Sequence, residues 1–339
     1  MNATVPAPKR LGFFTRLLDD TTPGERYRLA SEQIIHAERH GFDSAWVAQH
    51  HFHEHEGGLP SPFVLLAHLA ARTQSIRLGT GVITLPLENA IRVAEDAAVL
   101  DLLSAGRLEL GLGTGGTAES FAAFGLHSDE RGRVYAEHLV LLRRAWAGDV
   151  VVSQERLYPD APQLLQRLWQ ATFSRAGGER AALAGDGLLL SRTQPRPADN
   201  PQASLGELQN PIIDDYLAAL PAGATPRIMG SRSLFVADDR QEALHFAEVG
   251  LRRALSRQPQ PAADPRAPLE TLLRQFDIHV GTAEDVIRSL RADSTLQRVT
   301  DLVFQVHSID PPHAYVLRSI ELIAERVAPE LGWRSGSPD

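Results

Sequence analysis

The order of apolar and polar residues along the chain predicts short buried strands that alternate with amphipathic helices. Residues 42–48 are mostly apolar, as in a strand that is covered on both faces. Within residues 25–40, apolar residues recur three and four positions apart, which places them on one face of a helix, and Gly41 follows as a stop signal. Strands that alternate with such helices indicate βα units and a parallel sheet.

This βα unit recurs at a regular interval. The first four predicted strands begin at residues 11, 42, 76 and 107, a spacing of 31 to 34 residues. The predicted strands are 11–15, 42–48, 76–85, 107–113, 168–173, 187–190, 228–236 and 301–307. Eight such units make a (β/α)8 TIM barrel of about 250 residues. We therefore predict a single-domain α/β barrel over residues 1–332, followed by a disordered tail over residues 333–339.

Two stretches interrupt the repeat, at residues 193–210 and 257–268, and both are rich in Pro, Gln and Ala. The βα pattern resumes after each of them, so we interpret them as loop insertions rather than domain linkers. Substrate specificity is expected to lie in such variable loops.

Composition and charge narrow the class of protein. A hydrophobic content of 43% and a charged content of 22% are those of an ordinary soluble globular protein. The net charge of −8 gives no general attraction to nucleic acids or anionic membranes, so neither is expected as a partner. The absence of cysteine excludes disulfides and thiolate chemistry. Without an apolar leader or spanning segment in the sequence, a cytoplasmic location is expected.

Four histidines directly follow the second predicted strand. His50, His51, His53 and His55 come just after the apolar run, where loops of α/β proteins carry active sites. A metal site is one interpretation, but the spacing matches no template for converging ligands, so no metal is expected. Because imidazole titrates near neutral pH, a general acid or base is the favoured role for at least one of the four.

A glycine-rich loop follows the fourth predicted strand. Residues 111–116 match G-x-G-x-x-G, and Asp129 and Glu130 lie beyond it, so a doubly wound dinucleotide-binding fold is an alternative. The motif lies in the fourth unit, however, where such a fold would carry it in the first. The glycines either satisfy backbone dihedral angles or expose amides to a phosphate or a flat ring; we favour the second interpretation.

Together these motifs resemble the bacterial luciferase-like flavin monooxygenases over essentially the whole chain. The resemblance rests on residues 41–52, where the family typically has Glu-His-His-Phe and this chain has Gln49-His50-His51-Phe52. It continues through LGTGVITLP at residues 78–86, LDLLSAGR at 100–107 and GLGTG at 111–115. In the second half it rests on shorter matches at residues 169–171, 185–187 and 280–282.

The resemblance implies a TIM barrel that uses reduced FMN as co-substrate, supplied by a separate flavin reductase. Reduced FMN and O2 would form a flavin hydroperoxide that oxygenates a small organic substrate. A homodimer is implied in the same way. The alternatives are a deazaflavin-dependent oxidoreductase, a non-catalytic flavin-binding protein on the same barrel, and a metal-dependent hydrolase that uses the histidine loop.

The resemblance also implies roles for individual residues. His50 occupies the first histidine of the family motif, which gives it the proton-transfer role. Gln49 replaces the usual Glu and so removes an anion that would help keep the next histidine charged. A cis peptide bond is implied between Gly81 and Val82, beneath the flavin ring.

Other residues are implied as flavin contacts. The ring would be lined by Gly113, Thr114 and Gly115. The flavin phosphate would be bound by Ser174 and the amides of Gly177 and Gly178, with Arg131 or Arg133 as the charge partner. Two plainer interpretations stay open: Ser174 as a helix cap alone, and the two arginines as part of a solvated charge run.

Overall fold

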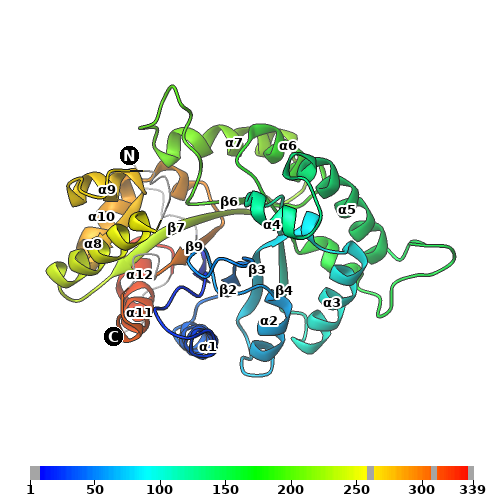
Figure 1. Ribbon diagram of the computed structural model, residues 1–339, viewed down its shortest axis with the longest axis horizontal. Coiled ribbons are helices and arrows are strands. Elements are labelled where there is room, and N and C mark those ends of the chain that lie inside the picture. Colours follow the sequence, from blue (N-terminus) through cyan, green and yellow to red (C-terminus); the bar gives the residue numbers. More distant parts are fainter. Residues whose placement is uncertain (1–7, 258–262, 307–310, 335–339) are drawn as a thin grey trace.

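The structure is a computed structural model that describes residues 8–257, 263–306 and 311–334. Eight parallel strands close into a barrel in the order β1-β2-β3-β4-β5-β6-β7-β9, and β9 pairs with β1 to complete it (Figure 1). The predicted TIM barrel is therefore confirmed, and the doubly wound alternative is wrong. The barrel strands are β1 (Arg10–Thr15), β2 (Ser44–Val47), β3 (Arg77–Thr84), β4 (Leu108–Gly113), β5 (Leu168–Ala171), β6 (Gly187–Leu190), β7 (Ile228–Val236) and β9 (Asp301–Gln305).

Helices surround the barrel and cover its outer face (Figure 1). They are α1 (Pro23–Arg39), α2 (Pro62–Ala70), α3 (Ala90–Leu103), α4 (Ala118–Ala123), α5 (Arg131–Trp146), α6 (Arg175–Leu183), α7 (Leu205–Ala219), α8 (Arg240–Ser256), α9 (Leu269–Gln275), α10 (Ala283–Ala292), α11 (His313–Leu322) and α12 (Ala328–Glu330). Among the described residues, no helix has both the length and the apolar character needed to cross a membrane.

The seventh βα unit is more elaborate than the repeat predicts. A ninth strand, β8 (Ile278–Gly281), lies outside the barrel and pairs with the carboxyl-terminal half of β7. It was missed because its sequence, Ile-His-Val-Gly, contains no continuous apolar run. The first predicted insertion, residues 193–210, ends in structure: Ser204 caps α7 in a capping box with Glu207, so residues 205–210 are helical.

The predicted disordered tail is wrong at its start. Trp333 is buried and stacks on Phe304 at a ring distance of 6.3 Å, and its carbonyl accepts a hydrogen bond from the Lys9 amide. Arg334 forms an ion pair with Asp43 at 2.6 Å. A buried indole fixes the chain through burial of its large apolar surface. Residues 335–339, like residue 307 at the end of the last predicted strand, lie outside the described residues.

Two tryptophans fill the interior of the barrel, each over a glycine of the next strand. Trp46 of β2 is in register with Gly79 of β3, and Trp169 of β5 with Gly187 of β6. The two indoles meet edge to face at 5.9 Å. A Cβ at either glycine would lie 2.3 Å from the indole beside it. The glycines are therefore required by close packing, which lets two large aromatic rings fit inside a narrow barrel.

Replacing Gly79 with alanine is expected to destabilise the protein by about 1–3 kcal/mol, the usual cost of overpacking a core. The new methyl group would overlap Trp46. Urea denaturation monitored by tryptophan fluorescence measures the change. Gly132→Ala in α5 is the matched control, because a Cβ there meets nothing within 4 Å; a loss of stability in the control as large as in Gly79→Ala would contradict the explanation.

Candidate active site

A cavity of about 290 Å³ lies at the carboxyl end of the barrel strands, the end at which TIM barrels bind their ligands. We call it the barrel cavity. Its walls combine apolar side chains of the barrel interior with polar groups that follow the strands. The lining residues are Phe14, Arg16, Trp46, Ala48, His50, Gly81, Leu189, Ser191, Arg192, Thr193, Met229, Ser231 and Val303. A largely apolar cavity with a few convergent polar groups is the usual form of a small-molecule site.

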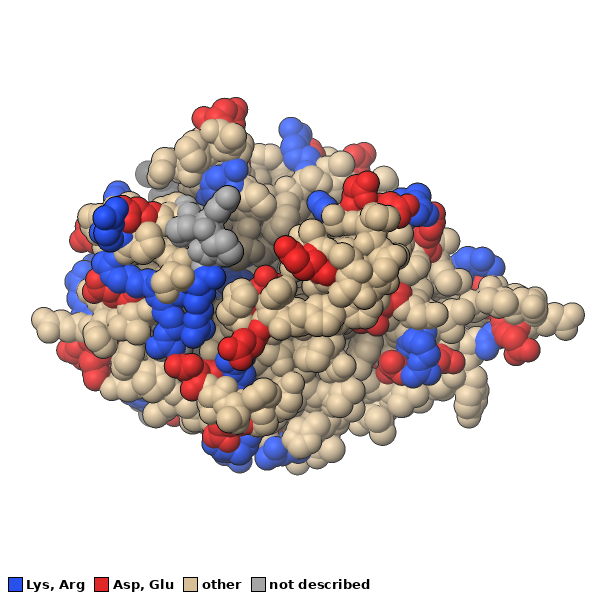
Figure 2. Space-filling view, viewed as in Figure 1, with Lys and Arg blue, Asp and Glu red and all other residues tan. Residues whose placement is uncertain are grey.

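The face of the molecule seen in Figure 2 carries basic and acidic side chains in mixed groups. Acidic side chains lie beside most of the basic ones on the face seen in Figure 2, and uncharged surface separates these groups. This pattern agrees with the net charge of −8 and with a small-molecule ligand inside the barrel.

His50 is the only one of the four clustered histidines that lines the barrel cavity. Its backbone amide donates to the carbonyl of Leu59 at 3.0 Å, which ties the two ends of the loop together. The Nδ1 atom is buried and has no hydrogen-bond partner among the described residues. Burial, the positive charges of Arg16 and Arg192, and His51 lower the pKa of His50 to about 3. His50 is therefore a neutral imidazole at pH 7 and can accept a hydrogen bond.

Gln49 holds the base of the histidine loop. Its side-chain oxygen accepts from the Thr84 amide at 2.8 Å, and its side-chain nitrogen donates to Glu88 at 2.6 Å and to the Pro60 carbonyl at 3.2 Å. Gln49 is buried, so these bonds satisfy its whole amide group. The chain thus carries a carboxylate at Glu88, hydrogen-bonded to the position where the family typically has one.

The other loop histidines point elsewhere. His51 packs edge to face on Phe124 at 5.0 Å, and His53 lies beside His55 at 5.6 Å. Negative charge on Glu88 partly offsets the burial that lowers the pKa of His51.

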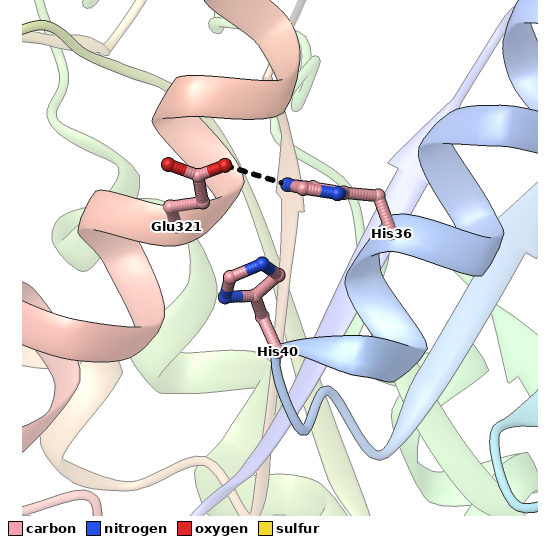
Figure 3. Close-up of side chains that lie close together, drawn as sticks. All are labelled: His36, His40 and Glu321. Atoms are coloured by element: carbon pink, nitrogen blue, oxygen red, sulfur yellow. Dashed lines mark hydrogen bonds and ion pairs between the residues drawn. The ribbon is translucent and has the colours of Figure 1, made fainter.

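A separate cluster links the first and last large helices. His36 of α1 is 3.0 Å from Glu321 of α11, and the His40 ring lies 4.4 Å from that of His36 (Figure 3). In the described part of the chain this is the one group of three possible metal ligands within 4.8 Å, and it contains none of the loop histidines. Glu321 is also bound by Arg318 at 2.8 Å. Hydrogen bonding between two packed helices explains the cluster.

The implied cis peptide bond between Gly81 and Val82 is present. The glycines of the next strand pack against this segment: a Cβ on Gly113 would lie 2.7 Å from Val82, and one on Gly115, where φ is +72°, would lie 2.4 Å from Thr84. Close approach of β4 to β3 therefore explains both glycines. Thr114 lies between them and is half-buried, and of these residues only Gly81 lines the barrel cavity.

The predicted phosphate contacts lie at the start of α6. Ser174 accepts from the amide of Gly177 at 3.2 Å and is therefore a helix cap. The amides of Gly177 and Gly178 both donate to the Ser174 carbonyl, so each already has a partner. Arg131 and Arg133 are exposed on α5; Arg133 pairs with Glu130 and Glu137. None of these residues lines the barrel cavity.

Sequence reasoning missed Arg16 and Arg192, which contribute two positive charges to the barrel cavity. Arg16 directly follows β1, and Arg192 lies two residues beyond β6. The rule that singled out His50, a polar residue just after a buried strand, applies to both. Applied to every predicted strand, it would have found them.

The lowered pKa of His50 predicts a pH-dependent stability. The unfolded chain binds a proton on this histidine near pH 6.5, whereas the folded protein does so only near pH 3. Its contribution is therefore fully present above pH 6.5 and is lost as the pH falls through this window, by about 2 kcal/mol between pH 7.5 and pH 5. Urea denaturation at both values should give a smaller difference for His50→Gln than for wild type. Equal differences would contradict the assigned pKa.

The closed barrel, with a histidine in the cavity at the carboxyl end of its strands, defines a (β/α)8 protein with an enzyme-like site. The chain belongs to the luciferase-like monooxygenase family, whose sequence model matches residues 11–297. It is thus a member of a family of oxidoreductases.

The relatives of this chain include monooxygenases. The chain is 29% identical to 4-hydroxyprotoasukamycin monooxygenase from Streptomyces nodosus subsp. asukaensis over 315 residues, which cover 85% of this chain and 82% of that protein. It is 30% identical over 158 residues to the oxygenase component of flavin-dependent trigonelline monooxygenase from Acinetobacter baylyi, covering 45% of this chain and 44% of that protein.

Solved structures share the fold. Monooxygenase RslO1 from Streptomyces bottropensis superposes with a TM-score of 0.75 at 25% identity, over 95% of this chain and 99% of that one. The coenzyme F420-dependent tetrahydromethanopterin reductase from Methanopyrus kandleri gives a TM-score of 0.70 at 17% identity, over 96% and 99% of the two chains. At that identity the likeness is one of fold, and the fold is compatible with more than one cofactor.

Proposed function

We propose that this protein is the oxygenase of a two-component, FMN-dependent monooxygenase. Reduced FMN, when bound, supplies two electrons to O2, so that one oxygen atom enters a small organic substrate and the other leaves as water. The observation that carries the proposal is the position of His50 in the wall of a partly apolar cavity, in a chain of the luciferase-like monooxygenase family.

The chemistry of the barrel cavity fits a flavin ring. Phe14, Trp46 and Val303 offer flat and aliphatic walls that exclude water. The Nδ1 atom of His50 and the Nε atom of Arg16 are buried and have no hydrogen-bond partner in the part of the chain that the structure describes. Unpaired buried polar atoms in a cavity are suited to a polar ligand. His50 would accept and return a proton beside the reacting atoms.

We assign the remaining flavin contacts to the segments that the family resemblance implies. Gly81, Val82, Gly113, Thr114 and Gly115 would lie against the ring. For the phosphate we propose the start of α6, at the exposed Ser174 and the buried Gly177 and Gly178, although the two glycine amides already donate within the turn. Arg131 is the better of the two arginines, because Arg133 is held by two carboxylates.

A separate flavin reductase is the proposed partner. Support comes from the trigonelline enzyme, whose matching chain is named as an oxygenase component. We further propose a homodimer in the cytoplasm.

Anaerobic titration with reduced FMN, and in parallel with reduced F420, tests the proposal. We expect reduced FMN to bind more tightly than oxidised FMN, and its oxidation after mixing with O2 to follow a different time course from that of free reduced FMN. Binding of reduced F420 alone would favour the deazaflavin-dependent alternative. Oxidation of bound FMN at the rate of free FMN would favour a non-catalytic flavin-binding protein, and absence of binding would refute all three.

A further inference from the structure

Arg192 is a buried arginine that has no counter-charge among the described residues. It follows β6 and lines the barrel cavity, and its guanidinium lies over the Phe14 ring at 5.6 Å. No hydrogen bond or ion pair joins its side chain to any described residue. Arginine has five N–H donors, and the fold leaves those of Arg192 facing the cavity unused.

Other buried arginines of this chain are fully engaged. Arg107 donates to Thr73 and to backbone carbonyls of the loops around it at 2.7–3.1 Å. Arg232 pairs with Asp293 at 2.6 Å and donates to Gln209 at 3.0 Å. The fold thus satisfies buried guanidinium groups where they serve structure, which sets Arg192 apart.

A second positive charge lies in the same cavity. Arg16 donates to the Glu56 carbonyl, but its buried Nε atom has no partner among the described residues. Burial and the charge of Arg16 lower the pKa of Arg192 to about 9. At neutral pH both groups remain charged, and each makes the other's charge more costly to hold. In the described part of the chain, Glu56 is the one negative charge that acts on Arg16.

We propose that Arg16 and Arg192 form an anion-binding subsite beside His50, and that the substrate of this enzyme carries a carboxylate or a comparable oxyanion. A guanidinium binds such a group through paired hydrogen bonds, and burial away from water strengthens the attraction. The substrate assignment rests on the proposed monooxygenase function.

Reduced FMN is the other source of an anion, through its phosphate or its ring. Residues 172–178, where we place the phosphate, do not line the barrel cavity. The phosphate and the substrate anion therefore have separate sites in this assignment, and the two sources are distinguishable by experiment.

Isothermal titration of the FMN-loaded protein with benzoate, and with benzamide as its neutral isostere, tests the proposal. Wild type is expected to prefer benzoate at least tenfold, and Arg192→Met to lose this preference while Arg192→Lys retains part of it. Because removing an unpaired buried charge relieves its cost, the melting temperature of Arg192→Met should equal or exceed that of wild type. Arg107→Met, which leaves several backbone carbonyls without their hydrogen-bond donor, should have a lower melting temperature than wild type.

Anaerobic titrations with reduced FMN and reduced riboflavin complete the test. Unchanged affinities in Arg192→Met support the substrate assignment. Three results would overturn the proposal. A tenfold loss of affinity for reduced FMN alone in Arg192→Met would assign Arg192 to the phosphate, and a loss of affinity for both flavins would assign it to the ring. Equal binding of benzoate and benzamide to wild type would show that there is no anion-binding subsite. If wild type binds no reduced flavin, the proposed function fails. The anion site is then tested by the same titration of the flavin-free protein with benzoate and benzamide, and equal binding of the two overturns it.

Discussion

Replacing His50 with alanine is expected to lower the rate of substrate oxygenation by at least roughly 100-fold, the usual contribution of a general acid or base. The affinity for reduced FMN should stay within a few-fold of wild type, because the imidazole occupies one part of a cavity with many other walls. Product formation and O2 consumption, measured together, separate lost oxygenation from unproductive flavin oxidation.

His51→Ala is the matched control for this experiment. The neighbouring histidine packs on Phe124 outside the barrel cavity, so its removal should change the rate only a few-fold. A pH profile adds a second criterion: a titration seen in wild type and absent from His50→Ala would assign it to this imidazole. Product formation at the wild-type rate in His50→Ala would refute the catalytic role.

The fold was predictable because its signals are local and repeated. Each barrel strand is an apolar run buried on both faces, and the spacing of the runs matches one βα unit. The errors fall where the pattern carries no local signal. The strand β8 contains a histidine between its apolar residues and pairs with β7 outside the barrel, and Trp333 is held by Phe304, which lies far from it in the sequence.

The site was predictable only in part. His50 stood out because histidines cluster after β2, but single arginines after β1 and β6 resemble ordinary surface residues until the barrel closes around them. Ser174 shows the opposite limit: its position and residue type suit both a cap and a phosphate contact, and the structure demonstrates the cap. Sequence position selects candidates, whereas burial and missing partners separate the functional groups from the structural ones.

Gln49 departs from the family motif in the sequence, and yet the structure gives its side-chain amide hydrogen-bond partners on both the oxygen and the nitrogen. Its amide nitrogen donates a hydrogen bond to Glu88, and an ionised glutamate at position 49 would have no hydrogen to donate. Glu88 faces His51, where its charge favours the protonated imidazole, while His50 faces two arginines and stays neutral. The exchange of Glu for Gln at position 49 therefore fits a chain whose carboxylate is at position 88.

Restoring the family residue by Gln49→Glu is accordingly expected to weaken this protein. Two carboxyl groups would meet across 2.6 Å, and at least one of them could ionise only with difficulty. Since the shared proton raises a carboxyl pKa in the folded state, the variant should be least affected at low pH and lose stability as the pH rises, by about 2 kcal/mol or more at pH 8. The loop that carries His50 would loosen with it, and oxygenation would slow.

Urea denaturation at pH 5 and pH 8 measures the effect. Gln49→Glu combined with Glu88→Gln rebuilds the hydrogen bond in reverse and should recover most of the lost stability. A single variant as stable as wild type at pH 8, or a double variant no better than the single, would show that the contact between positions 49 and 88 does not hold the histidine loop.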